Sequence, residues 1–126
     1  MEGTNFELVE DFMEAMGQDV NVVPSWPDEE TQRLRVDLIE EELDELHYAM
    51  DNKDMVEIAD ALGDLLYVVY GAGHAFGIDL DECFKEIHAS NMSKLGPDGK
   101  PIKREDGKVL KPDTFFPPDL KSILGL

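Results

Sequence analysis

Residues 54–76 limit most strongly what this chain can fold into. The segment includes ALGDLLYVVYGAGHAF, where apolar residues occupy nearly every position instead of one stripe. A helix that is apolar all round must be covered by neighbours on several sides. The pattern therefore predicts either the central helix of a bundle or a helix at a contact between subunits.

Two helical patterns precede this segment. Residues 4–16 repeat apolar side chains every three or four positions, begin with a Thr-x-x-Glu capping box and are followed by a glycine, which predicts a first helix. Residues 27–50 predict a longer second helix, for which Ser25 and Asp28 have the spacing of a capping box. Together the patterns indicate an all-α fold, a bundle of four to five helices.

The chain changes character after a fourth expected helix, which should bury Leu80, Phe84 and Ile87 on one face. Residues 93–126 hold five of the seven prolines, seven of the eleven basic residues and two Asp-Gly pairs. The second pair is typical of the turn of a small hairpin. We expect one domain over residues 1–126, with a helical body at 1–92 and a basic, loop-rich, lid-like tail at 93–126.

The charge balance narrows the function classes. The chain has 29 acidic and 11 basic residues, and its net charge is −18. Such a charge repels a phosphate backbone, so we expect metal cations rather than nucleic acid as partners. The longest apolar stretch is shorter than the roughly 20 residues that span a bilayer, and the first residues lack the pattern of a signal peptide. We therefore expect no membrane partner and a cytoplasmic location.

A cluster of carboxylates in the second helix is the main chemical signal. Glu41 and Glu45 are four residues apart and Glu42 and Glu45 three apart, so the three side chains share one helical face. Taken alone, such a run is better explained as a solvated acidic surface. We interpret the neighbouring Glu40 and Asp44 in that way.

Asp64 favours a different explanation for the other three carboxylates. It lies within the most apolar helix, where an ionised carboxylate without a partner would cost several kcal/mol. It needs a proton or a cation, and a metal ion shared with Glu41, Glu42 and Glu45 would be that cation. Carboxylate oxygens alone select a hard ion, so the predicted cofactor is Mg²⁺, with Mn²⁺ as the alternative. A di-iron bundle would need paired Glu-x-x-His sequences, which this chain lacks.

The motif Glu-Glu-x-x-Glu at Glu41, Glu42 and Glu45, followed by ALGD ending at Asp64, resembles that of the all-α nucleoside triphosphate pyrophosphohydrolases. This group includes MazG, the dimeric dUTPases and phosphoribosyl-ATP pyrophosphohydrolase. The resemblance continues through DLLYVVYGAGHAFGIDLDECFKEIHASNMSK and DGKVLKP. Within the group, the chain is most similar to the short MazG-like branch related to bacterial dUTP pyrophosphatases.

This resemblance implies a MazG-like bundle that hydrolyses a nucleoside triphosphate to the monophosphate and pyrophosphate with Mg²⁺, for house-cleaning or control of nucleotide pools. The expected substrate is a deoxynucleotide such as dUTP or dCTP, and the expected assembly is a homodimer or a higher homo-oligomer. Glu45 and Asp64 are implied as metal ligands, and Glu41 as a ligand or a supporting group. Glu42 is implied both at the metal and as the group that orients or deprotonates the attacking water.

The chain departs from the family pattern at Ala61, where the family has a glutamate. Asp60 is the first candidate to compensate, because it lies about 40° from Asp64 around the helix. Glu57 lies on nearly the same face as residue 61, but about 6 Å further toward the helix N-terminus. A site with one ligand fewer, completed by water, is the other interpretation. It keeps open a catalytically weakened relative that binds nucleotide or regulates a partner.

Four residues in or near the tail are the predicted substrate contacts: Asn91, Lys94, Lys108 and Lys111. The lysines could close over the phosphates, while the asparagine hydrogen-bonds phosphate, sugar or base. Any single lysine is better explained as a solubilising loop residue. The group, in so acidic a chain, favours a role in binding an anion.

Overall fold

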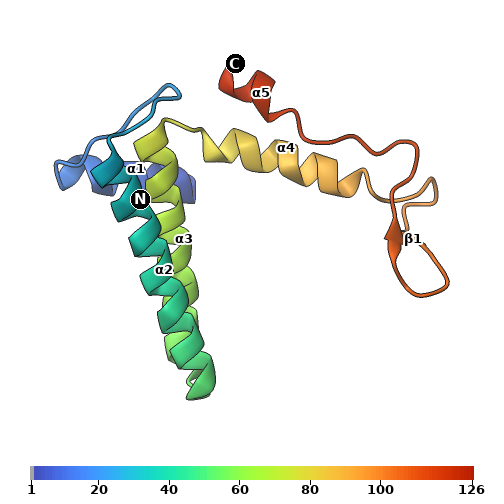
Figure 1. Cartoon of the computed structure of the whole chain (residues 1–126), viewed down its shortest axis with the longest axis horizontal. Helices are drawn as coiled ribbons and strands as arrows, with labels where there is room; N and C mark the ends of the chain where they lie inside the picture. The colour runs from blue at the N-terminus through green and yellow to red at the C-terminus, as the bar shows by residue number, and fades with distance from the viewer. Residues whose placement is uncertain (1) are drawn as a thin grey trace. The chain divides into compact units, whose positions relative to one another are not determined.

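The computed structural model describes residues 2–126, and over this range it contains five helices and one two-stranded antiparallel hairpin (Figure 1). The predicted all-α fold, with a small hairpin in the C-terminal region, is confirmed. The chain forms two compact units, one ending at Leu80 and the other running from Asp81 to Leu126. Among the helices of residues 2–126, none is long and apolar enough to cross a membrane.

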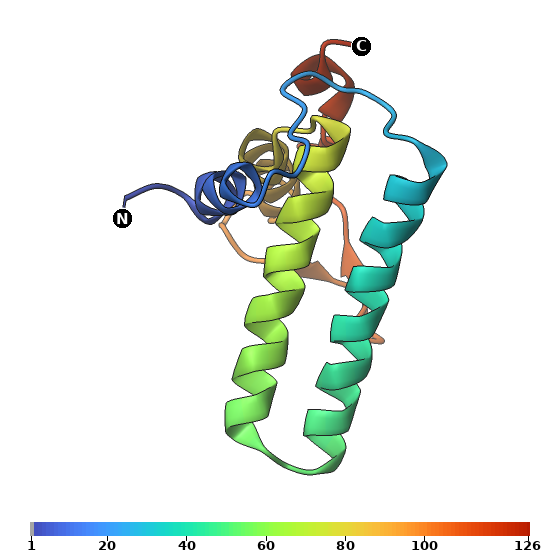
Figure 2. The same cartoon turned by 90° about the vertical axis from the view of Figure 1, so that its left-hand side faces the viewer.

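The first unit contains helices α1 (Asn5–Ala15), α2 (Glu29–Asp51) and α3 (Met55–Phe76). Helices α2 and α3 lie side by side and antiparallel, joined by a short turn in which Lys53 has a positive φ of 51° (Figure 2). Helix α1 packs against α3. The long α2–α3 pair therefore brings the acidic second helix alongside the apolar third.

Helix α2 begins at Glu29, slightly later than the sequence pattern predicted. Asp28 is its N-cap, and its carboxylate accepts a hydrogen bond from the backbone N–H of Thr31 at 2.7 Å. Ser25, which the pattern placed in the cap, instead donates its hydroxyl to the carbonyl of Val23 at 3.0 Å. Asp28 has an extended backbone, with φ −62° and ψ 163°, so the first helical residue is Glu29.

Aromatic contacts at the C-terminal half of α3 hold α1 in place. The His74 ring stacks on Phe6, with ring centroids 3.7 Å apart, and its Nε2 donates to the Phe6 carbonyl at 2.7 Å. Phe12 contacts Tyr67 edge-on, with 5.5 Å between ring centroids. Met13, on the same helix, is only 1% exposed. The best-buried part of this unit therefore lies where α1 meets α3.

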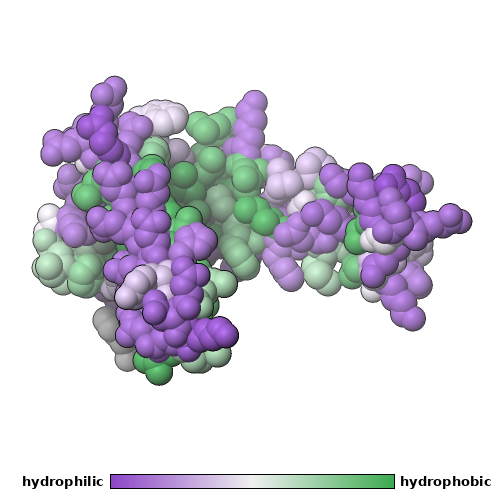
Figure 3. Space-filling view, turned by 60° about the horizontal axis from the view of Figure 1, so that its bottom comes forward, coloured by the Kyte–Doolittle hydropathy of each residue, from purple (hydrophilic) through white to green (hydrophobic). Residues whose placement is uncertain are grey.

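Much of α3 is left uncovered within the first unit. Its apolar residues Leu62, Leu66 and Tyr67 are 47%, 53% and 41% exposed. Figure 3 shows hydrophobic surface next to hydrophilic side chains on one face of the molecule. Burial on several sides, which the pattern predicted for the centre of a bundle, is therefore not met within the first unit, because α1 and α2 cover only part of the helix.

The second unit contains most of α4 (Leu80–Met92), the strands β1 (Ile102–Lys103) and β2 (Val109–Leu110), and α5 (Leu120–Leu124). The two strands pair antiparallel, which confirms the predicted hairpin. The second Asp-Gly pair forms its turn, in which Gly107 has a positive φ of 88°.

The buried face of α4 differs from the predicted one. Leu80 is half-buried, but Phe84 and Ile87 are 72% and 37% exposed, whereas Cys83 and Ser90 are buried. The Ser90 hydroxyl donates to the carbonyl of Phe116 at 2.7 Å, so the tail covers this part of the helix. A polar contact with the tail therefore accompanies the burial of Ser90, which apolar periodicity did not predict.

Candidate metal centre

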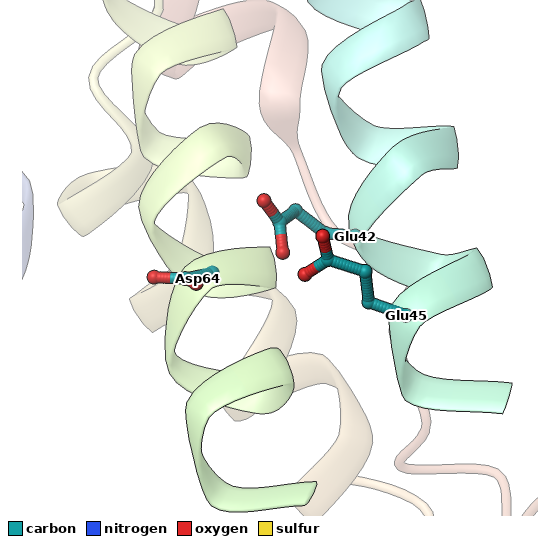
Figure 4. A group of neighbouring side chains, drawn as sticks. All are labelled: Glu42, Glu45 and Asp64. Atoms are coloured by element: carbon teal, nitrogen blue, oxygen red, sulfur yellow. The ribbon is translucent and has the colours of Figure 1, made fainter. Parts of the chain in front are cut away.

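The second and third helices bring three of the predicted carboxylates together. Glu42 and Glu45 lie one turn apart on α2 and extend toward α3, which carries Asp64 (Figure 4). One oxygen atom from each of the three side chains lies within 4.8 Å of the other two. Residues far apart along the chain thus form one compact acidic group, which we call the carboxylate triad.

Glu42 is the most enclosed member of the triad. One of its carboxylate oxygens is buried and has no hydrogen-bond partner within residues 2–126. Burial, a hydrogen bond shared with Glu45, and the charges of Glu45, Asp64 and Asp60 together raise the pKa of Glu42 to about 7. Crowded carboxylates disfavour one another's ionised form, so the triad favours a proton or a bound cation.

Asp64 is less enclosed than the sequence suggested. It is only partly buried, because much of α3 around it is uncovered within the first unit. Burial still raises the pKa of Asp64, and the charges of Asp60 and Glu45 raise it further. The requirement for a cation therefore comes from the crowded carboxylates as much as from the apolar helix.

The other predicted ligands lie at the edge of the triad. Glu41 is exposed and is not one of the three clustered carboxylates. Asp60 is exposed as well, yet its charge raises the pKa of both Glu42 and Asp64. A position this close is compatible with a ligand role for Asp60, which stays a prediction.

Ala61, where the family pattern has a glutamate, is 2% exposed and lines a hollow of about 540 Å³. The other residues that line this hollow come from α2, α3 and the turn between them: Asp44, Glu45, Tyr48, Ala49, Asn52, Asp54, Glu57 and Asp60. Both candidates to compensate for Ala61 therefore border the same space. So does Asp44, which the sequence pattern left as a surface residue.

Three carboxylates at this spacing suit a hard divalent cation. Oxygen atoms are the ligands that Mg²⁺ and Mn²⁺ prefer, and Mg²⁺ usually keeps several water ligands besides. A bound cation would interact with the unpartnered oxygen of Glu42 and offset the repulsion within the triad. The residues present therefore fit the predicted cofactor.

The predicted substrate contacts lie in the second unit and have local surroundings there. Lys94 Nζ donates to the side-chain carbonyl of Asn91 at 3.0 Å. Lys111 Nζ lies 4.6 Å from the centre of the Phe115 ring, and Lys108 is exposed just after the hairpin turn. Contact of these residues with a substrate stays a prediction.

The sequence pattern assigned no role to Arg35 on α2. Its Nε and the Glu42 oxygen are the two buried side-chain atoms without a hydrogen-bond partner within residues 2–126. The sequence did carry one indication: Arg35 lies seven residues before Glu42, which places both side chains on one helical face.

Comparison with known proteins assigns the chain to a family. Residues 9–91 match the phosphoribosyl-ATP pyrophosphohydrolase family, a range that includes all three residues of the triad. The chain belongs to this family. Phosphoribosyl-ATP pyrophosphohydrolases are part of the all-α nucleoside triphosphate pyrophosphohydrolase superfamily, so the resemblance seen in the motif is confirmed at that level. The family is named for a pyrophosphohydrolase activity.

A viral protein is one relative of this phosphoribosyl-ATP pyrophosphohydrolase domain. The chain is 46% identical over 82 residues to the uncharacterized protein L479 of Acanthamoeba polyphaga mimivirus. The match covers 62% of this chain and 33% of the viral protein. The chain thus spans about a third of the length of the curated relative that it matches.

Proposed function

We propose that the protein hydrolyses a nucleoside triphosphate to the monophosphate and pyrophosphate in a Mg²⁺-dependent reaction. The observation that carries this proposal is the carboxylate triad, in which Glu42, Glu45 and Asp64 bring oxygens within 4.8 Å of one another. The family match over residues 9–91 supports it. That match favours an enzyme over the alternative of a catalytically weakened, regulatory relative.

In the proposed reaction, water attacks one of the two phosphorus atoms that flank the α–β bridging oxygen, and the bond from that phosphorus to the bridge breaks. Bound Mg²⁺ would supply neutralisation of phosphate charge and a lower pKa of the attacking water. Glu45 and Asp64 would hold the ion, with Glu41 as a further ligand or a supporting group and Asp60 in place of the missing glutamate. Glu42 would orient the water and accept its proton.

The proposed substrate is a deoxynucleoside triphosphate such as dUTP or dCTP, as the resemblance to the short MazG-like branch implies. Phosphoribosyl-ATP is the second candidate, because the matched family is named for it. The residues proposed to contact the substrate are Asn91, Lys94, Lys108 and Lys111. They would provide cationic and amide groups in a chain whose net charge is −18.

We also propose that the protein works as a homodimer or a higher homo-oligomer. The support is the exposed apolar surface of α3, where Leu62 and Leu66 are 47% and 53% exposed. Burial of this surface against a second copy would supply the coverage that an apolar helix requires.

The test is release of pyrophosphate from a panel of dNTPs, NTPs and phosphoribosyl-ATP in the presence of Mg²⁺. We expect turnover of at least one nucleotide, and a loss of roughly a hundredfold or more in Glu45→Gln and in Asp64→Asn. Glu40→Gln is the matched control, because it removes a nearby exposed carboxylate from α2 and should keep wild-type activity. Absence of turnover with every nucleotide, or full activity in Asp64→Asn, would contradict the proposal.

A further inference from the structure

The hollow of about 540 Å³ between α2 and α3 begins at the carboxylate triad, because Glu45 belongs to both. On α2, its lining continues with Tyr48 about one helical turn and Asn52 about two turns beyond Glu45. On α3, it continues with Ala61 and, about one turn further from the triad, Glu57. The hollow therefore extends from the triad toward the turn between the helices, over about 10 Å.

The middle of the hollow is suited to a flat, apolar group. Its lining includes two small buried side chains, Ala49 and Ala61. Tyr48 lies beside them and is 73% exposed, so its ring is available for stacking. A glutamate at residue 61, as in the family pattern, would extend into this space, whereas alanine leaves it open. The volume of the hollow is typical of sites for small molecules.

The far end of the hollow offers acceptors of hydrogen bonds more than donors. Asn52 Nδ2 donates to the backbone carbonyl of Tyr48 at 2.8 Å, so this amide already uses one of its donors. Asp54 caps α3 and accepts from the backbone N–H of Glu57 at 3.2 Å. The Glu57 carboxylate is exposed at the same end, and an ionised carboxylate can only accept. A ligand that reaches this end is therefore favoured if it carries N–H groups.

We propose that the hollow binds the nucleobase of the substrate and that Glu57 selects a base with an exocyclic amino group, cytosine in place of uracil. This inference rests on the proposed function and adds the identity of the base. With the phosphates held at the triad, the sugar and the base would extend along the hollow. The ring would then lie at Tyr48 and its polar edge at Glu57. Of the two deoxynucleotides proposed as substrates, dCTP is the preferred one.

The selection follows from the donors and acceptors on the edge of the base. Cytosine carries the N4 amino group, a donor, where uracil carries the O4 carbonyl, an acceptor. Against a carboxylate, the amino group gains a charge-assisted hydrogen bond, whereas the carbonyl places two acceptors in contact. The N3–H of uracil lies between two carbonyl oxygens, so a carboxylate that approaches it also meets an acceptor.

A further cation and a second copy of the chain are the other occupants to test. The carboxylates that line the hollow could hold additional Mg²⁺, and Tyr48 could pack against another copy. The lining by Tyr48, Ala49 and Ala61 favours the base over a cation, because a cation gains nothing from small apolar side chains. Continuity with the triad favours the base over a second copy, because a nucleotide held there extends into the hollow.

The experiment measures the affinity of the full chain for dCMP and for dUMP by calorimetry, with Mg²⁺ present. The two monophosphates share sugar and phosphate, and their binding does not depend on turnover. We expect dCMP to bind roughly tenfold or more tightly, as a hydrogen bond to a charged group predicts. Glu57→Gln should bring the ratio of the two affinities close to one, because an amide can donate to O4 as well as accept from N4. The affinity for Mg²⁺ should stay unchanged.

Tyr48→Ala tests the stacking contact. The variant should weaken the binding of both nucleotides by roughly fivefold or more and leave their ratio unchanged, whereas Tyr48→Phe should bind them as the wild-type protein does. Glu40→Gln and Phe84→Ala are the matched controls, because each changes an exposed side chain of the same kind that does not line the hollow. Both controls should stay within about twofold of wild type.

Equal affinity of the wild-type protein for dCMP and dUMP would overturn the inference, and so would a preference that survives Glu57→Gln. Fewer bound Mg²⁺ ions in Glu57→Gln, with an unchanged ratio, would assign the hollow to a cation. Dissociation of an oligomer in Tyr48→Ala by light scattering, with unchanged nucleotide affinity, would assign it to a second copy. Failure of the proposed function looks different, because no triphosphate would release pyrophosphate while the binding preference is still measured.

Discussion

At the scale of single residues, Glu42 links stability to chemistry. Its buried oxygen lies among the carboxylates of the triad, where ionisation is unfavourable without a counter-charge. A proton on Glu42 and a cation bound by the triad relieve the same repulsion. Raising the pH of the metal-free protein removes the proton, and adding Mg²⁺ supplies the cation.

We expect the free energy of unfolding of the metal-free protein to fall as the pH rises. The pKa of Glu42 is raised from 4.5 to about 7 in the folded protein, so between these values the folded state keeps a proton that the unfolded chain loses. The stability that this proton contributes is fully present below pH 4.5, the ordinary pKa, and is lost as the pH rises past about 7, the pKa in the folded protein. Urea unfolding with a chelator at about pH 5 and about pH 8 measures the difference.

Glu42→Gln separates this residue from the rest of a strongly acidic chain. The amide carries no proton that titrates in this range, so the variant should lose less stability between the two pH values. Added Mg²⁺ should raise the stability of the wild-type protein at the higher pH more than that of the variant. An unchanged pH dependence in Glu42→Gln would contradict the assignment.

Asp60→Asn is expected to weaken Mg²⁺ binding by roughly tenfold or more, measured by calorimetry. The reason is that the charge of Asp60 reaches both Glu42 and Asp64. Glu57→Gln tests the other candidate, which borders the same hollow but lies further along α3 from Asp64 and should bind Mg²⁺ as the wild-type protein does. No effect in Asp60→Asn would rule out Asp60 as the compensating ligand, and no effect in either variant would favour a site completed by water.

The residues of the triad could be proposed from the sequence because their signals are local. Glu42 and Glu45 are one turn apart, and Asp64 interrupts an apolar helix. The hollow beside the triad could not be predicted, because it depends on the register between two antiparallel helices. The partial exposure of Asp64 was missed for a similar reason, since it depends on what covers α3.

At the scale of helices, two glycines at helix ends share a conformation but not their surroundings. Gly17, after α1, and Gly77, after α3, have φ values of 72° and 70°. A Cβ at Gly77 would lie 1.9 Å from the carbonyl oxygen of Val23, whereas a Cβ at Gly17 would meet nothing within 4 Å. Gly77 therefore also permits the α1–α2 connection to pass close to the end of α3.

Gly77→Ala should destabilise the fold by several kcal/mol, because the clash is with backbone that cannot move freely. Gly17→Ala should cost only about 1–2 kcal/mol, the penalty for a left-handed residue with a Cβ. Urea unfolding of the two variants measures both. Equal losses would show that the approach of Val23 does not constrain the fold.

Helix ends were predictable where the capping residues lie within a few positions of the helix end in the sequence. The capping box of Thr4 and Glu7 is present as the sequence indicated, with Thr4 Oγ1 accepting from the backbone N–H of Glu7 at 3.2 Å. The start of α2 was placed too early because Asp28, not Ser25, is the N-cap and is itself extended. On α4, the burial of Ser90 was missed, and its contact is with a distant tail segment at Phe116.

At the scale of the whole molecule, Leu66→Glu should convert an oligomer to a smaller species. Leu66 is 53% exposed on α3, and a charge there would prevent burial against a second copy. Light scattering should report a dimer or a larger assembly for the wild-type protein. Val22→Glu is the control, since Val22 is 84% exposed in a loop and should leave the mass unchanged. A monomeric wild-type protein would contradict the proposed assembly.

The all-α class could be predicted because apolar periodicity acts within each helix. The neighbours that cover α3 could not be predicted. Its apolar sequence indicates that neighbours are needed but not whether they belong to the same chain. Leu62 and Leu66 remain exposed in a chain whose helices are otherwise correctly assigned. The family match spans the same helices and leaves the identity of the substrate to experiment.

Phosphorus NMR of the reaction products tests the central claim most directly. With Mg²⁺ and an accepted nucleoside triphosphate, the protein should yield equal amounts of nucleoside monophosphate and pyrophosphate. The same mixture with a chelator, or with Asp64→Asn in place of the wild-type protein, should stay unreacted. Formation of a nucleoside diphosphate and phosphate, or undiminished hydrolysis in Asp64→Asn, would contradict a pyrophosphohydrolase built on the carboxylate triad.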